Sequence, residues 1–224
     1  MFNKKLTVEI NYPIDEETIK NSIKTIPENF PKYFKTIPKK QFSLSFKRFI
    51  PFLKTIKSCP GFINICKRSI LITAPSDAYA LFDKNQILTQ RTGLSSFTTF
   101  SVQENDQLLS YVPNKDYKFI VKYMFPYRFK TNFSYLINQA SYHFPNIQIL
   151  PGIIDSTYND TLSFFIFIKK DQDELYIKQG DVLGLITPLC ENKLKLKFKR
   201  KKPEEYNQLF TFDNTKKFIL KKLF

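Results

Sequence analysis

The chain has 224 residues, of which 42% are hydrophobic, so it is long and apolar enough to form the core of one domain of ordinary to large size. This composition excludes a wholly disordered chain. With 35 Lys and Arg against 20 Asp and Glu, the formal charge of +15 favours acidic partners, namely nucleic acid, an anionic membrane surface or an acidic protein.

Residues 1–57 are interpreted as a partly helical N-terminal arm. The segment "LTVEI" alternates in polarity and predicts a strand. Asp15 is placed as the N-cap of a helix with acidic residues in its first turn, and Ile19, Ile23 and Ile26 fall on one face. Four prolines interrupt the apolar segment that follows, so we expect an arm that packs on its own domain or on a neighbouring subunit.

Residues 58–203 predict a core domain of short strands. Ser58 is placed to cap a short helix that has Pro60 near its first position. From Ser69 onward, short apolar runs alternate with turn signals, a spacing typical of an antiparallel sandwich, roll or barrel. The runs are "ILIT", "DAYALF", "QILTQ", "FTTFSV", "QLLSYV", "YKFIVKYMF", "SYLINQ", "TLSFFIFIKK", "ELYIK", "DVLGLITPL" and "KLKLKFK". We therefore expect a mainly β fold, an antiparallel β-roll or jelly-roll-like domain.

The end of this domain is strongly basic. "KLKLKFKRKK" alternates strictly, which predicts an edge strand with Leu194, Leu196 and Phe198 on one face and lysines on the other. The basic run is either a solvated strand face or a polyanion-binding site. Its residues are Lys193, Lys195, Lys197, Lys199, Arg200, Lys201 and Lys202. Residues 204–224 form a C-terminal tail, either a short amphipathic helix or a strand.

The stretch "PGIIDSTYNDTLSFFIFI", followed by "LYIKQGDVLGLITP", resembles the central motifs of the dUTPase and dCTP-deaminase superfamily. Gly152, Ile154, Asp155 and Tyr158 match its Gly-x-Ile-Asp-x-x-Tyr turn. The later Gly-Asp turn is matched by residues 180–181, and "APSDAYALF" is similar to an early strand that carries an acidic residue, here Asp77. The resemblance implies a dUTPase-like fold.

If the protein is an enzyme of this superfamily, the same resemblance implies that Asp155 activates water and that Tyr158 packs beneath a deoxyribose. It also implies Asp77 as a further acidic residue of the site and Mg²⁺ as the cofactor. The glycine-rich C-terminal loop that holds the triphosphate in this superfamily has no counterpart, since no glycine follows Gly184. The mid-chain segment "PYRFKTNFSYL" fits the phosphate-binding pattern only loosely. We therefore favour no catalytic residue and expect no cofactor.

A second resemblance spans roughly residues 57–190. The segments "KSCPGFINICKRSILITAPSDAYALF", "PYRFKTNFSYL", "LPGIIDSTYNDTLSFFIFI" and "IKQGDVLGLITPL" occur in the order seen in a set of proteins of tailed phages and other aquatic viruses. This resemblance implies a β-rich viral protein without implying a mechanism.

The leading hypothesis is thus a non-enzymatic viral structural or virion-associated protein that acts by assembly and binding. Its expected partners are other copies of itself, with a trimer as one form, and other virion proteins, with a nucleic-acid contact open. The alternatives are a dUTPase-superfamily nucleotide hydrolase or deaminase and a nucleic-acid-binding accessory protein. We expect the protein in the virion or the host cytoplasm, because the sequence shows neither a signal peptide nor an apolar run long enough to span a membrane.

Two simpler interpretations apply to the Gly-Ile-Ile-Asp segment. Asp155 is a turn residue that bonds its own backbone, and Tyr158 closes the corner between two strands. Gly152 is expected to supply a positive φ in a tight turn.

Overall fold

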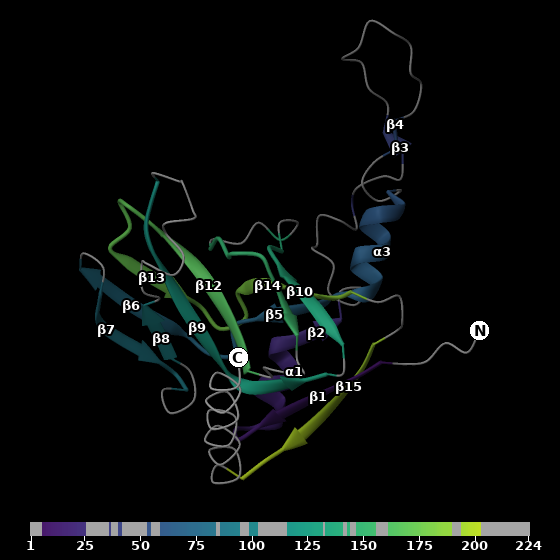
Figure 1. Ribbon diagram of the computed structural model, residues 1–224, viewed down its shortest axis with the longest axis horizontal. Helices are drawn as coiled ribbons and strands as arrows, with labels where there is room; N and C mark the ends of the chain where they lie inside the picture. The colour runs from purple at the N-terminus through teal and green to yellow at the C-terminus, as the bar shows by residue number, and fades with distance from the viewer. Residues whose placement is uncertain are drawn as a thin grey trace, which may run out of the picture.

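The computed structural model describes residues 6–25, 36, 40–41, 53–54, 59–83, 86–94, 99–102, 116–131, 133–140, 143, 147–155, 161–189 and 194–202. Within these ranges the protein is mainly β, with several sheets whose strands are mostly antiparallel (Figure 1). The expectation of a mainly β fold is therefore confirmed. Of the predicted strands, residues 107–112 lie outside the described ranges, as does the tail at 204–224.

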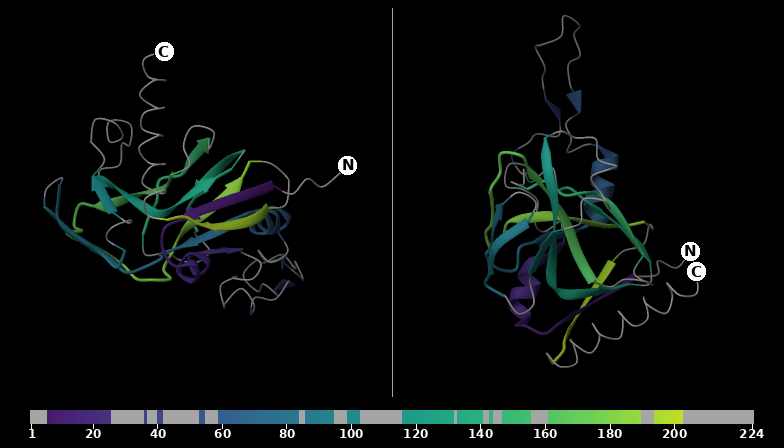
Figure 2. Two further views of the ribbon diagram at one scale, coloured as in Figure 1. Left: turned by 90° about the horizontal axis from the view of Figure 1, so that it is seen from below. Right: turned by 60° about the vertical axis from the view of Figure 1, so that its left-hand side comes forward.

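The first sheet is organised around one long strand, β9. Its order is β12-β9-β1-β15, and β8 also pairs with β9, on a different stretch from the one that β1 uses. The strands are β12 (Thr161–Lys169), β9 (Tyr117–Lys130), β1 (Leu6–Tyr12), β15 (Leu194–Arg200) and β8 (Thr99–Val102). β1 and β15 pair in parallel over seven residues, so the two ends of the described chain run side by side (Figures 1 and 2).

A bulge in β9 lies where proline interrupts the strand. Thr161 is paired with Arg128 and Ser163 with Met124, so three residues of β9 oppose the single residue Leu162. The central one of these three is Pro126, which has no N–H to give to the ladder. A bulge at this point lets β9 keep pairing on both sides of the proline while the strand bends.

The second sheet has the order β11-β10-β14-β5-β2. Its strands are β11 (Gly152–Asp155), β10 (Ser134–Asn138), β14 (Val182–Pro188), β5 (Ile70–Thr73) and β2 (Ile23–Thr25). The third sheet consists of β13 (Glu174–Ile177), β6 (Ala78–Asp83) and β7 (Gln86–Thr92), and a two-stranded sheet joins β3 (Lys40–Gln41) to β4 (Leu53–Lys54). The second and third sheets lie on opposite sides of the molecule (Figure 1).

The segment before β11 connects the first two sheets. The amide of Leu150 donates to the carbonyl of Phe165 at 2.8 Å, and the amide of Phe167 donates to the carbonyl of Gln148 at 2.9 Å, so residues 148–150 pair with β12. β11 then pairs with β10. The Gly-Ile-Ile-Asp segment is thus a strand that follows a corner. Gly152 has no positive φ, so that expectation was wrong. Among the described glycines only Gly180 has a positive φ, of 87°.

The main core is aromatic and lies between the sheets. Phe125 and Phe164 meet edge-on with ring centroids 5.0 Å apart, and Tyr123 contacts Phe125 in the same way at 5.0 Å. Such edge-to-face pairs add to the stabilisation from burial. Burial also raises the pKa of Tyr12 to about 12.

The start of the chain contributes to this core. Ile10, Tyr12, Ile19 and Ile23 are all fully buried in the main cluster. Helix α1 (Glu16–Ser22) begins after Asp15, whose carboxylate accepts hydrogen bonds from the amides of residues 17 and 18 at 2.9 and 2.8 Å, so the predicted N-cap is confirmed. Ile23 belongs to β2 rather than to the helix, and residue 26 lies outside the described ranges.

The second helix, α3 (Pro60–Arg68), covers part of the outer face of the second sheet (Figure 1). Its residues Phe62 and Cys66 pack on Leu71 and Leu185 in a small separate cluster. The expected cap was wrong, because the N-cap is Cys59, which makes no side-chain capping bond, and Ser58 lies outside the described residues. No described helix is both long and apolar enough to cross a membrane.

Candidate functional site

Asp155 lies at the end of the edge strand β11. It is exposed and is paired with Ser134 of β10, whose carbonyl accepts a hydrogen bond from the amide of Leu189 at 3.1 Å. Asp155 therefore sits close to the carboxyl end of β14. Tyr158 lies outside the described residues, so the proposed pairing of a carboxylate with a tyrosine ring stays a prediction.

Asp77 lies in the turn between β5 and β6, where it contacts the predicted Gly-Asp turn. Its carboxylate accepts a hydrogen bond of 2.7 Å from the amide of Gln179, which is the residue before Gly180. Asp181 closes the same turn, since its carboxylate accepts from the amide of Lys178 at 2.8 Å. Two segments that carry the dUTPase-like resemblance are therefore in contact.

The two candidate acidic residues do not meet in one chain. Asp77 lies beside the amino end of β14 and Asp155 beside its carboxyl end. β14 has seven residues, and at about 3.3 Å per residue its ends are roughly 20 Å apart. A catalytic arrangement that uses both carboxylates would therefore require two copies of the chain.

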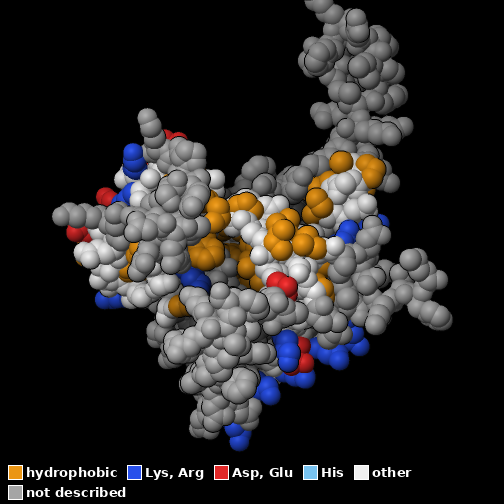
Figure 3. Space-filling model, viewed as in Figure 1, with side chains coloured by type: hydrophobic (Ala, Val, Ile, Leu, Met, Phe, Trp, Pro, Cys, Tyr) orange, Lys and Arg blue, Asp and Glu red, His pale blue; other side chains and the backbone are white. Residues whose placement is uncertain are grey.

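Among the described strands, the basic strand β15 lies at the edge of the first sheet, as the alternating sequence predicted. Lys195, Lys197 and Lys199 are exposed, and Leu196 and Phe198 are half-buried against the core. Lys and Arg side chains follow the edge of the molecule where β15 runs (Figure 3). An ion pair of 2.7 Å joins Lys199 to Glu9 of β1, and this contact lowers the pKa of Glu9.

The remaining basic residues of the run differ in exposure. Arg200 and Lys202 are exposed, whereas Lys201 is half-buried and its amide donates to the carbonyl of Tyr12 at 2.8 Å. Lys193 lies outside the described residues. The structure thus presents an exposed row of three lysines, two residues apart and so about 6.8 Å from one to the next.

A feature that sequence reasoning missed is an exposed apolar area on the outer face of the second sheet. Ile153 of β11 is 65% exposed, and its cross-strand partner Leu136 is half-buried on the same face. Leu189, just beyond β14, is 53% exposed. Figure 3 shows hydrophobic side chains gathered over β10 in the middle of this view. We call Leu136, Ile153 and Leu189 the β11 patch.

Metal ligands do not gather in the described part of the chain, where no three His, Cys, Asp or Glu side chains are placed to hold an ion. Comparison with protein-family models, with curated proteins and with solved structures finds no match to this chain.

Proposed function

We propose that the protein is a non-enzymatic structural subunit that acts by self-association, in keeping with the viral proteins that its sequence resembles. The observation that carries this proposal is the β11 patch, in which Ile153 is 65% exposed on a strand at the edge of its sheet. Large exposed apolar areas beside an open strand edge are typical of protein–protein contacts. In this proposal the β-rich domain is a β-roll or jelly-roll-like building block with a dUTPase-like core.

A second copy of the chain is the binding partner that the edge of β11 favours. In the described residues only β10 pairs with β11, so its other edge is open to a strand from a neighbour. The contrast with β15 supports this choice, because that edge carries a row of lysines, which discourages strand pairing. Most soluble assemblies are built from identical chains with closed symmetry, and β11 against β11 is self-complementary.

A charge placed in the β11 patch tests the proposal. Ile153→Lys is expected to shift the protein towards the monomer in sedimentation-velocity experiments, since a lysine cannot be buried unpaired in an apolar contact. Leu88→Lys is the matched control, because Leu88 is 55% exposed but lies on β7 of the third sheet. Equal behaviour of the two variants would contradict assembly through β11. Co-purification of the protein with virus particles would support the viral setting.

A nucleotide hydrolase or deaminase of the dUTPase superfamily is a second candidate. It is favoured by the contact of Asp77 with the turn at residues 179–181, which unites two segments of the resemblance. Because Asp155 is roughly 20 Å from this contact, the site would combine Asp155 of one copy with Asp77 of another. Turnover of a deoxynucleoside triphosphate with Mg²⁺ that Asp155→Asn abolishes would replace the structural proposal with this one.

A polyanion contact along β15 is the third candidate, and it is compatible with assembly. It is supported by the exposed row of Lys195, Lys197 and Lys199 on a protein of formal charge +15. Such a contact would be sequence-independent and sensitive to salt.

A further inference from the structure

The third sheet carries a shallow hollow on its outer face. Cross-strand pairing places Tyr176 of β13, Tyr79 of β6 and Arg91 of β7 in one row across the three strands. These three residues line a hollow of about 330 Å³ together with Asp77, Ala78, Thr92 and Gly93. Its walls are low and it is open to solvent, so a ligand would be held on one side only.

Two tyrosines form the floor of this hollow. Tyr176 is 52% exposed and Tyr79 is half-buried, although tyrosine rings are large apolar groups. Among the described residues neither ring stacks on another aromatic ring, and the Lys178 ammonium lies over one face of the Tyr176 ring. The chain has no tryptophan, which leaves tyrosine as its aromatic residue with both an apolar face and a polar tip.

The charged groups around the tyrosines balance one another. Arg91 and Lys178 are cationic, and the Lys178 ammonium lies 5.9 Å from the centre of the Tyr176 ring. Asp77 and Glu174 are anionic, and Glu174 accepts a hydrogen bond of 3.3 Å from the Tyr79 hydroxyl. This area therefore lacks the excess of positive charge that a phosphate backbone requires. It offers donors and acceptors side by side.

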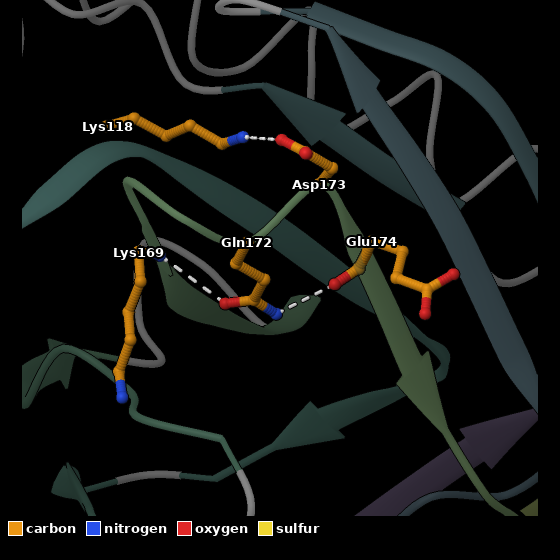
Figure 4. Close-up of polar contacts among 5 residues, drawn as sticks. All are labelled: Lys118, Lys169, Gln172, Asp173 and Glu174. Atoms are coloured by element: carbon orange, nitrogen blue, oxygen red, sulfur yellow. Dashed lines mark hydrogen bonds and ion pairs between the residues drawn. The ribbon is translucent and has the colours of Figure 1, made fainter.

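Polar contacts fix the segments on either side of the hollow. The Lys118 ammonium pairs with the Asp173 carboxylate at 2.8 Å, and the side-chain amide of Gln172 donates to the carbonyl of Glu174 at 2.9 Å (Figure 4). The carbonyl of Asp173 also accepts from the amide of Phe82 at 2.8 Å, which fixes the start of β13 against β6. At the other end of the row, the bond from Gln179 fixes Asp77. Hydrogen bonds thus fix the chain at the start of β13 and at Asp77, on either side of the tyrosines.

Arg91 is the group that distinguishes this hollow from an ordinary exposed sheet face. No hydrogen bond or ion pair joins its guanidinium to another described residue, although a carboxylate and two tyrosines lie nearby. A guanidinium presents five donors in a fixed plane. Opposite it, Asp77 uses one carboxylate oxygen for Gln179, which leaves the second oxygen as an acceptor.

We propose that this hollow binds a neutral sugar unit of an oligosaccharide. A sugar ring presents a face of C–H groups, which suits the negative face of a tyrosine ring. Its hydroxyl groups both donate and accept, so they can bond to Asp77 and Arg91 at the same time. A balanced charge and an aromatic floor suit such a ligand better than a nucleic-acid strand. This site is separate from the β11 patch and does not depend on assembly.

The test is saturation-transfer NMR with a panel of neutral hexasaccharides built from glucose, mannose, galactose or N-acetylglucosamine. We expect at least one to bind, with contacts from its ring protons. Tyr176→Ala is expected to weaken binding about tenfold, and Tyr176→Phe, which keeps the ring, to change it by less than about threefold. Arg91→Met should also weaken binding. Because Tyr176 and Arg91 are exposed, these variants should fold, which circular dichroism checks.

Leu88→Ala is the control, since Leu88 is exposed on the same sheet and does not line the hollow. The proposal is overturned if none of the hexasaccharides binds, or if Tyr176→Ala binds as well as the unmodified protein. A thymidine oligonucleotide serves as the competing probe. Binding of this oligonucleotide that depends on Tyr176, without binding of any sugar, would assign the hollow to single-stranded nucleic acid and likewise overturn the proposal.

Discussion

Asp77 and Gln179 are 102 positions apart in the chain, yet the carboxylate of Asp77 accepts a hydrogen bond of 2.7 Å from the amide of Gln179. The carbonyl of Asp77 also accepts from the amide of Gly93 at 2.9 Å. Asp77, which directly precedes β6, thus connects the turn after β13 to the end of β7. Asp77 therefore has a structural role, whichever function the protein has.

Replacement of Asp77 by alanine is expected to lower the free energy of unfolding by about 1 kcal/mol, because it leaves the Gln179 amide without its partner. Asp77→Asn should have a smaller effect, since the asparagine side-chain oxygen accepts the same bond. Urea unfolding of the two variants and the unmodified protein measures the difference. Equal losses for alanine and asparagine would show that this hydrogen bond is not the reason for the effect.

The turn at Gly180 gives a second prediction. Its φ of 87° lies in the region that side chains disfavour, so Gly180→Ala should destabilise the protein by about 1 kcal/mol. The matched control is Gly152→Ala, because Gly152 has no positive φ and an added Cβ would meet nothing within 4 Å. Thermal unfolding compares the two. A loss of stability for Gly152→Ala as large as that for Gly180→Ala would contradict the assignment of strain to the turn.

The capping residue Asp15 predicts a dependence of stability on pH. Hydrogen bonds from the Thr18 side chain and amide and from the Glu17 amide lower the pKa of Asp15 below its ordinary value of 3.8. A carboxylate with a lowered pKa in the folded state stabilises the fold above the unfolded value, and this contribution is lost as the pH falls through the folded pKa. Asp15→Ala should therefore be less stable than the unmodified protein at pH 7.

Urea unfolding from about pH 7 down to about pH 2 measures this effect. The difference between the two proteins should shrink as the pH falls below 3.8. Asp15→Asn keeps a capping oxygen without a titrating group, so it should lack this part of the pH dependence. A difference between Asp15→Ala and the unmodified protein that stays constant across the range would contradict the role of the charge.

The sequence predicted most of the described strands because alternation and apolar runs are local signals. β15 is the clearest case, since its lysines and apolar residues fall on opposite faces as the pattern indicated. Strand partners are not local, and the parallel pairing of β1 with β15 joins residues about as far apart as this chain allows. The same limit explains why residues 6–25, interpreted as part of an arm, supply buried residues to the main core.

The sites were harder to predict for the same reason. Asp77 and Asp155 were chosen for their motifs, and nothing local shows that β14 separates them. The exposure of Ile153 was not predicted, because an apolar residue in the sequence does not tell which face of an edge strand is covered. The row from Tyr176 through Tyr79 to Arg91 exists only once β13, β6 and β7 are paired.

The lysine row predicts salt-dependent binding to a polyanion. Retention on immobilised DNA should fall steeply as salt rises, and charge reversal of Lys195, Lys197 and Lys199 to glutamate should abolish it. Reversal of Lys67, Lys169 and Lys170 is the control, because these lysines are exposed on α3 and at the end of β12 and their reversal changes the net charge by the same amount. If both sets of variants lose retention equally, the general charge of the protein is responsible and β15 is not a specific site.

The most direct test of the central claim is the molar mass of the unmodified protein in solution, measured by light scattering over a wide range of concentrations. One chain has a mass of 26.5 kDa. Self-association through β11 predicts a mass that rises with concentration to a multiple of this value. A mass of 26.5 kDa at every concentration would contradict the claim that the protein works by assembly with copies of itself.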